Sequence, residues 1–454
     1  MKAQTENKMG TMPVNQLLVN ISLPMVISML VQALYNIVDS IFVAQIDEYA
    51  LTAVSLAFPM QNFMIAVAAG TGVGVNALLS KRLGEKRFKE VDQAANNAVF
   101  LAICNYLFFL VIGILFSEIY FSVQTDIPEI IQYGKTYLFI CMACSFGMYG
   151  QFCFERLLQA TGRTVCTMIT QTTGAVINLI FDPILIFGMF GFPKMGIAGA
   201  AVATVAGQIV AMIFALIYNW KVNHEIHLSL RGIRPDPQTL KHIYGEAVPA
   251  ILMQSIGSIM TFFMNRILLG FTSTAAAVFG VYFKLQSFIF MPMFGMNNGL
   301  IPIVAYNFGA GYKERIVKAL KSSMIVGIAI MLLGLATAEI IPARLLLLFN
   351  ASEQMLGIGV PALRILSLSY VFAGVSIVGS GVFQGLGKGK YSLLLSVVRQ
   401  LVVLIPMAYL LSLTGNVTAV WFSFPIAEIA AFTIAVFFLQ RIMKNLDGMI
   451  AERR

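Results

Sequence analysis

Charged residues are scarce in this chain: Lys, Arg, Asp and Glu together make up only 11% of its 454 residues. A soluble domain carries about 25%, so the composition excludes a globular protein whose whole surface faces water. Hydrophobic residues make up 58%, and they gather into runs of about 20, the length that crosses the hydrocarbon core as a helix. These runs are too long for the strands of a membrane barrel. The sequence therefore predicts an all-α polytopic membrane protein.

Motifs that would bind a nucleotide, a catalytic metal or a redox partner are also missing. No GxxxxGK[ST] loop occurs, and there is no HExxH, aspartate-rich or GxSxG motif. His224 and His227 have no evident third ligand, so they are interpreted as part of a solvated loop. Cys141 and Cys144 have redox spacing within an apolar helix and are interpreted as packing residues. We therefore expect no catalytic residues, no cofactor and no metal site other than one for Na⁺, and a membrane-embedded enzyme is disfavoured.

Twelve hydrophobic spans can be placed along the chain. Their predicted bounds are 17–46, 51–79, 93–116, 131–158, 164–189, 196–220, 243–269, 274–304, 318–341, 356–384, 391–412 and 417–440. The polar N-terminal stretch lacks the apolar core and cleavage site of a signal peptide, so the first span is expected to remain in the mature protein.

The positive charges alternate between the two ends of these spans. With the N-terminus inside, 23 of the 30 Lys and Arg residues fall on inner segments, 3 on outer loops and 4 within spans. Cytoplasmic loops carry such an excess, so we expect a multi-pass protein of the cytoplasmic (inner) membrane with both termini in the cytoplasm. Topology then explains the net charge of +9, and the expected surroundings are the lipid bilayer, with no nucleic-acid partner.

The two halves of the chain repeat one another at an offset of 225 residues, which pairs Pro24 with Pro249 and Gly70 with Gly295. The repeat predicts two pseudo-symmetric six-helix lobes, 1–220 and 243–454, joined by a cytoplasmic loop at 221–242. Six spans are an even number, so both halves run the same way through the membrane. This arrangement favours a monomeric transporter, with a substrate site between the lobes and alternating access, over a channel built from several chains. Without a nucleotide-binding module, an ion gradient is the remaining energy source.

Two acidic residues are predicted deep within the first half. Asp39 and Asp182 both lie about 10 Å below the outer boundary, counted at 1.5 Å per residue. Asn178 precedes Asp182 by one turn, and Thr204 reaches the same depth in the sixth span. Carboxylate and carbonyl oxygens suit Na⁺, and neighbouring buried carboxylates also bind H⁺. These four residues are therefore the candidate coupling-ion site.

Three further acids lie in or near the spans. Glu155 and Glu246 fall close to the cytoplasmic helix ends, where an interfacial ion pair or a helix cap is expected. Glu428 lies deeper in the last span, and both a structural and a functional role remain open for it.

Polar residues also recur at helical spacing within several spans, which requires them to face protein or water. These candidate cavity residues are Gln32, Tyr35, Asn36, Gln171, Ser258, Thr261, Asn265 and Lys284. A water-filled central cavity and ordinary hydrogen bonding between helices both remain open for each of them.

Several stretches resemble the multidrug and toxin extrusion (MATE) family. The resemblance extends over about residues 13–442 and rests on SLPMVISMLVQALYNIVDSIFVAQ, NLIFDPILIFG and the stretch that ends in Asn-Phe-Gly-Ala-Gly. It implies twelve helices in two six-helix lobes, the MATE fold. It also implies antiport: export of small organic cations and amphipathic drugs against entry of H⁺ or Na⁺, with antibiotic resistance as a consequence.

The resemblance assigns roles to particular residues. Asp39 corresponds to the family's aspartate in the first helix, and Pro24 to the proline at which that helix can bend. Asn178, Asp182 and Thr204 correspond to its first-lobe cation site.

One branch of the family has a glutamate in the seventh helix, where this chain has Gly257. The chain is therefore similar to the MepA-type and DinF-type branch, which works from the first lobe alone. A lipid-linked saccharide flippase of the same superfamily is the alternative function, although the cations available for its groove are few. A major-facilitator transporter would share the six-plus-six layout, but its later motifs do not fit.

Overall fold

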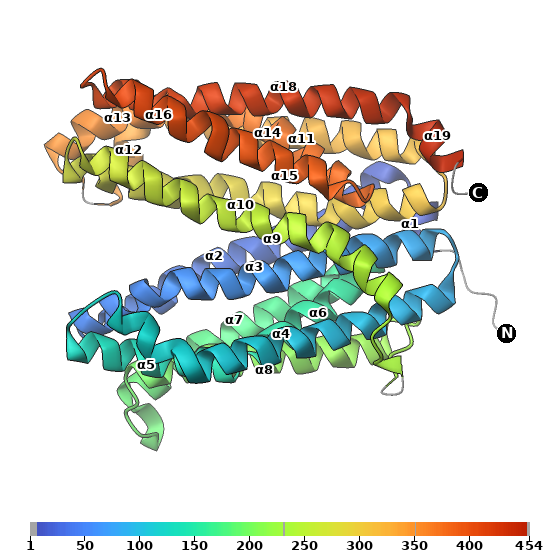
Figure 1. Ribbon diagram of the computed structural model, residues 1–454, viewed down its shortest axis with the longest axis horizontal. Helices are drawn as coiled ribbons and strands as arrows, with labels where there is room; N and C mark the ends of the chain where they lie inside the picture. Colours follow the sequence, from blue (N-terminus) through green and yellow to red (C-terminus); the bar gives the residue numbers. More distant parts are fainter. Residues whose placement is uncertain (1–6, 230–231, 350, 452–454) are drawn as a thin grey trace. The chain divides into compact units, whose positions relative to one another are not determined.

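The computed structural model describes residues 7–229, 232–349 and 351–451, and these residues form helices and no strand. The chain divides into two compact units. Unit 1 comprises the described residues of 1–26 and 252–454, and unit 2 comprises those of 27–251 (Figure 1).

Unit 2 contains most of the first sequence repeat. Its elements are the second part of α2 (Val14–Ala44), α3 (Glu48–Gly84), α4 (Phe88–Ser122), α5 (Pro128–Ala143), α6 (Phe146–Ala160), α7 (Thr164–Phe187), η1 (Met189–Gly191), α8 (Ile197–Lys221) and the first part of α9 (Pro237–Leu269).

Unit 1 contains most of the second repeat. Its elements are α1 (Lys8–Thr11), the first part of α2, the second part of α9, α10 (Ser273–Gly309), α11 (Lys313–Ile340), α12 (Pro342–Leu347), α13 (Glu353–Ser367), α14 (Tyr370–Gly385), α15 (Gly389–Val397), η3 (Val398–Leu404), α16 (Ile405–Ser412), α17 (Val417–Trp421), α18 (Ser423–Lys444) and α19 (Leu446–Ala451).

The helices agree with the twelve spans predicted from hydropathy. Ten are long and apolar enough to cross a membrane, and two bent pairs bring the total to twelve if each pair is one span. The pairs are α5 with α6, bent by 43°, and α13 with α14, bent by 46°. Each break falls inside a span that was predicted to be continuous, at 144–145 and at 368–369. The breaks occupy corresponding places in the two repeats.

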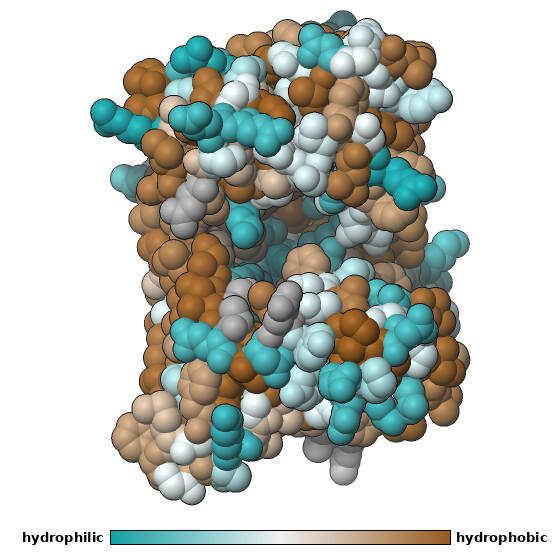
Figure 2. All heavy atoms as spheres, turned by 90° about the vertical axis from the view of Figure 1, so that its left-hand side faces the viewer, coloured by the Kyte–Doolittle hydropathy of each residue, from teal (hydrophilic) through white to brown (hydrophobic). Residues whose placement is uncertain are grey.

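The outer faces of the spans are apolar, as lipid contact requires. Phe108, Val111 and Leu115 of α4 are each about half exposed or more. Figure 2 looks onto the end of the molecule at the left of Figure 1, where hydrophilic and hydrophobic side chains are mixed and hydrophobic ones continue along the flanks. The exposed face of α4 is thus apolar along its length, as the sequence indicates.

Glycines shared by the two repeats bring helices into close contact within each unit. In unit 1, Gly295 of α10 lies against Met25 and Val26 in α2, where an added Cβ would come within 2.6 Å of the Val26 Cα. In unit 2, Gly70 of α3 lies in the same way against Ile251 in α9, with its Cβ position 2.8 Å from the Ile251 nitrogen. Small residues permit such approach of backbones. Grouping by contact therefore places the first part of α2 in unit 1 and the first part of α9 in unit 2, unlike the division at 220 and 243 that follows the repeats.

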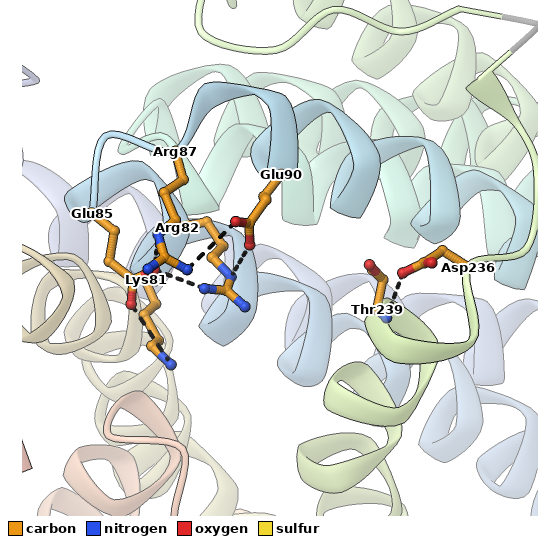
Figure 3. Close-up of polar contacts among 7 residues, drawn as sticks. All are labelled: Lys81, Arg82, Glu85, Arg87, Glu90, Asp236 and Thr239. Atoms are coloured by element: carbon orange, nitrogen blue, oxygen red, sulfur yellow. Dashed lines mark hydrogen bonds and ion pairs between the residues drawn. The ribbon is translucent and has the colours of Figure 1, made fainter. Parts of the chain in front are cut away.

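The connection between α8 and α9 is fixed to α4 within unit 2. Asn96 Oδ1 accepts the backbone N–H of Ser229 (3.0 Å), and Asn97 Oδ1 accepts that of Asp236 (2.9 Å). Asp236 then caps α9, because its Oδ2 accepts the N–H of Thr239 at 2.8 Å (Figure 3). Hydrogen bonds from the Thr239 side chain and backbone lower the pKa of Asp236.

The basic stretch between α3 and α4 is internally paired. The Arg82 guanidinium contacts Glu85 at 2.8 Å and Glu90 at 3.0 Å, and Arg87 contacts Glu90 at 3.4 Å (Figure 3). Part of the positive charge of this inner segment is thereby offset locally.

Candidate functional site

The two acids predicted in the first half meet inside unit 2. Asp39 comes from α2 and Asp182 from α7, and their side chains hydrogen bond to each other. Asp182 is fully buried, and Asp39 Oδ1 is buried without a donor in the described part of the chain. Two carboxyl groups can form this bond only when one of them holds a proton. The pair therefore has the chemistry of a proton or cation site.

Asn178 joins this pair to α8. With its amide turned so that each group meets its partner, the nitrogen donates to Asp182 Oδ2 at 3.1 Å. The oxygen then accepts from the Thr204 hydroxyl at 3.3 Å and from the Thr204 backbone N–H at 3.2 Å. Asn178 and Asp182 share a face because they are four residues apart in a helix. All four predicted ion-site residues thus lie together, and their oxygens suit a hard cation such as Na⁺.

A polar cavity lies beside this group within unit 2. It measures about 710 Å³, including the space open to solvent, and reaches from Asn178 and Thr204 to Glu155 on α6. Gln32, Tyr35 and Gln171, which were predicted as cavity residues, line it, whereas Asn36 is exposed and does not. Phe152, Met148 and Ile65 add apolar wall. The cavity combines the apolar surface and convergent polar groups typical of a small-molecule site.

Three residues around Asp39 were not recognised from the sequence. Gln61 Nε2 donates to the Tyr137 hydroxyl at 3.2 Å and contacts Cys141 Sγ at 3.8 Å. The charge of Asp39 acts on both Tyr137 and Cys141. Cys141 is buried, as its interpretation as a packing residue predicts. The one signal available was the position of Tyr137 one helical turn before Cys141.

Glu155 is buried and forms neither an ion pair nor a helix cap among the described residues, so that interpretation was wrong. Its residue is only 2% exposed. Oε1 accepts from Gln151 Nε2 (3.0 Å) and the Thr170 hydroxyl (2.9 Å), and Oε2 accepts from Gln171 Nε2 (2.7 Å). No salt bridge to Glu155 is found among the described residues. Three neutral donors, contributed by α6 and α7, hold this carboxylate at the cavity wall.

The remaining predicted cavity residues lie in unit 1. These are Ser258, Thr261, Asn265 and Lys284. The Thr261 hydroxyl donates to the Gly257 carbonyl of its own helix at 2.9 Å, and the Lys284 ammonium lies 5.9 Å from the ring centre of Phe349. A role for these four residues in binding substrate stays a prediction.

Unit 1 contains a partly buried ion pair between Arg399 and Glu428, and the sequence left the role of Glu428 open. Arg399 Nη1 lies 3.2 Å from Glu428 Oε1, and the two side chains are 25% and 13% exposed. Arg399 belongs to η3, a stretch of π-helix in the middle of a span, and such stretches frequently mark functional positions. Glu428 therefore has a basic partner, unlike Asp182, whose described neighbours include none.

Pro24 lies inside α2, two residues before the point where that helix passes from unit 1 to unit 2. Its counterpart Pro249 lies two residues before the same point in α9. A proline in a helix removes one backbone hydrogen bond and favours a bend. Bending at Pro24 itself stays a prediction.

Comparisons with known proteins agree with this architecture. The MatE family model matches residues 24–184 and 249–410, once in each repeat. The multidrug export protein MepA of Staphylococcus haemolyticus (strain JCSC1435) is 26% identical over 431 residues, which cover 94% of each chain. MepA of Staphylococcus aureus (strain MRSA252) is 24% identical over 96% of this chain and 97% of its own.

Solved structures give the same result. An outward-facing multidrug resistance MATE family transporter of the MOP superfamily superposes with a TM-score of 0.92 at 25% identity, over 99% of this chain and 100% of its own. A MOP superfamily transporter from Pyrococcus furiosus gives 0.87 at 25% identity, over 98% and 99%. The predicted fold class is confirmed, and so is the prediction that the chain is not an enzyme. The chain belongs to the MatE family of multi-pass membrane transporters.

Proposed function

We propose that this protein exports cationic and amphipathic small molecules by alternating access, in exchange for H⁺ or Na⁺ that enters through Asp39 and Asp182. The observation that carries the proposal is the buried carboxyl pair beside the polar cavity of unit 2. The relatives named as multidrug export proteins support drugs as the exported substrate.

The exchange follows from the charge of the pair. Two buried carboxylates repel each other and therefore hold one proton between them, and the one negative charge that remains attracts a further cation. Binding of H⁺ or Na⁺ from outside neutralises the pair and removes its attraction for a cationic substrate in the cavity. The substrate then leaves outward, and release of the cation inside restores the negative charge.

The proposal is tested by ethidium efflux from proteoliposomes under separately imposed H⁺ and Na⁺ gradients. Asp39→Asn and Asp182→Asn are expected to reduce gradient-driven export to the level of empty liposomes, because neither amide can take up the ion. Asp447→Asn is the matched control, since Asp447 is exposed and paired with Lys313 in unit 1. Full export by both variants would overturn the coupling, and no drug movement by the wild type would overturn drug export itself.

We further propose a monomer in the cytoplasmic membrane with both termini inside. The support for this orientation is the excess of Lys and Arg on alternate loops. α1 and α19 lie at the same end of unit 1, where Arg315 and Lys313 bind them (Figure 1). Reporter fusions at either terminus should be active in the cytoplasm; activity outside would reverse the assignment.

A further inference from the structure

The carboxyl group of Glu155 is a second buried acid of unit 2 that the proposed function does not use. It lines the same cavity as Asn178 and Thr204. Gln171, which donates to it, and Asp182 are eleven positions apart on α7, and this corresponds to about 16 Å along the helix. Glu155 therefore lines the cavity toward the inner end of α7, and Asn178, which donates to Asp182, lines it toward the outer end.

The surroundings of Glu155 lack a positive charge on the cavity side. Its three donors are neutral side chains. The adjacent Arg156 acts on it through its charge, but the Arg156 guanidinium turns to Gln159 Oε1 (2.8 Å) and packs on Gly72 of α3.

Beside Glu155, one oxygen is still without a donor. Gln171 donates its amide nitrogen to Glu155, and its Oε1 is buried and receives no hydrogen bond from the described residues. Leaving a buried acceptor without a donor is unfavourable. A carboxylate next to such an oxygen offers what a small cation needs, because both groups accept hydrogen bonds from a proton carrier and both can coordinate Na⁺.

The second repeat provides an internal comparison. At the offset of 225, Glu155 corresponds to Ser380 and Thr167 to Ser392. The Thr167 hydroxyl donates to the Glu155 carbonyl (3.4 Å), and the Ser392 hydroxyl donates to the Ser380 carbonyl (2.9 Å). The helix junction is thus made in the same way in both units, with an acid in one and a serine in the other. Building the junction does not require the carboxylate.

The second repeat also lacks the side chains that donate to Glu155. Gln151, Thr170 and Gln171 correspond to Ser376, Leu395 and Ser396 in the second repeat. Unit 2 therefore has both an acid and the side chains that donate to it, whereas the equivalent place in unit 1 has no acid.

We propose that Glu155 and the Gln171 side-chain oxygen form a second binding site for the coupling cation, at the inner end of the unit 2 cavity. This inference rests on the proposed function and extends it. Glu155 holds a small monovalent cation, H⁺ or Na⁺, in addition to the one taken up at Asp39 and Asp182, and releases it to the cytoplasm when substrate binds. Tyr35 and Gln32 add polar groups to the lining of the same cavity.

The test counts the cations released when substrate binds to purified, reconstituted protein. Tetraphenylphosphonium is added in weakly buffered solution, and H⁺ is followed with a pH indicator. Na⁺ release is followed with a Na⁺-sensitive dye in a second arm at fixed pH, and this arm identifies the ion. The variants are Glu155→Gln, Glu155→Ser, Gln171→Leu and Asp182→Asn, with Glu118→Gln as the control because Glu118 is exposed and paired with Lys135.

Both Glu155 variants are expected to release about one cation fewer per protein than the wild type, since one carboxylate binds one monovalent cation. Gln171→Leu keeps the carboxylate and is expected to need a higher cation concentration for the same release. Glu155→Ser introduces the residue that the second repeat has at the equivalent position, Ser380. It is therefore expected to fold even if Glu155→Gln is unstable.

Release equal to the wild type from both Glu155 variants, together with a defect in Asp182→Asn, would overturn this inference and leave the proposed function standing. Normal release and export by Asp182→Asn would instead remove the proposed function. Loss of release in Glu118→Gln would show that the readout responds to surface charge, and this too would overturn the inference.

Discussion

The ion pair between Arg399 and Glu428 is held within a span, where an isolated charge is expensive. The attraction between the two opposite charges offsets the cost of removing each of them from water. Glu428 Oε2 receives no hydrogen bond in the described chain, so Arg399 is the main stabilising contact of this carboxylate.

Glu428→Gln is accordingly expected to destabilise the protein by about 3 kcal/mol, since it leaves Arg399 without its counter-charge. Arg399→Gln should cost a similar amount. The double variant should recover much of the loss, because no unpaired charge remains. Thermal unfolding in detergent gives the three values as a double-mutant cycle, and purely additive losses would show that the pair contributes nothing.

At the scale of single residues, depth could be predicted and partners could not. Counting residues from the span ends placed Asp39 and Asp182 at one level, because the rise of a helix is fixed. The donors to Glu155 depend on how α6 and α7 are rotated against each other, which a single sequence does not encode. For Glu428, the partner Arg399 lies in a π-helical stretch that changes which side chains face inward, and no glycine or proline within 398–404 signals it.

At the scale of helices, the cap of α9 responds to pH. Folding lowers the pKa of Asp236 below its usual 3.8, because the charged form accepts the Thr239 hydrogen bonds. The stabilisation is therefore complete above about pH 3.8, the ordinary value of the unfolded chain, and is lost as the pH falls through the lower folded value.

Proteolysis of the 221–236 segment in the wild type should accordingly increase on acidification through this range. Asp236→Asn should show a flatter pH profile, since asparagine caps a helix without titrating. Equal profiles for the two proteins would assign the pH dependence to another group.

Close packing of α2 on α10 depends on Gly299. A Cβ there would lie 2.5 Å from Ser22 Oγ and 2.9 Å from the Ser22 Cα, so backbone must move. Gly299→Ala is expected to destabilise the protein by about 1–3 kcal/mol, as overpacking does. The matched control is Gly280→Ala on the same helix, where nothing lies within 4 Å and alanine should be neutral or stabilising. Equal melting temperatures for both variants would contradict the close contact.

The helices also set the limit of prediction from hydropathy. The predicted spans coincide with ten long helices and the two bent pairs, because each is a long apolar run. The breaks at 144–145 and 368–369 could not, because Cys144, Ser145, Leu368 and Ser369 include neither proline nor glycine. A bend of more than 40° at these places is set by packing within each unit, to which local sequence gives no signal.

At the scale of the molecule, the sequence repeat and the compact units divide the chain at different places. The repeat divides the chain in the 221–242 loop, whereas the units exchange the first parts of α2 and α9. The exchange follows the repeat, because Val26 and Ile251 are equivalent at the offset of 225. Val26 packs on Gly295 of α10, and Ile251 packs on Gly70 of α3. The Gly pairs were visible in the sequence, but which helix each pair contacts was not.

This exchange has a consequence for how the gene can be divided. If the chain is divided into two polypeptides between Lys221 and Pro237, the first lacks the α9 part of unit 2 and the second lacks the α2 part of unit 1. Neither polypeptide could then complete a unit alone. Co-expressed from separate genes, the two fragments are expected to copurify from membranes and restore ethidium export, while either one alone should be degraded. Stable, soluble-in-detergent fragments that do not associate would contradict this mutual complementation. Each fragment thus supplies a helix segment that the other fragment needs to complete its unit.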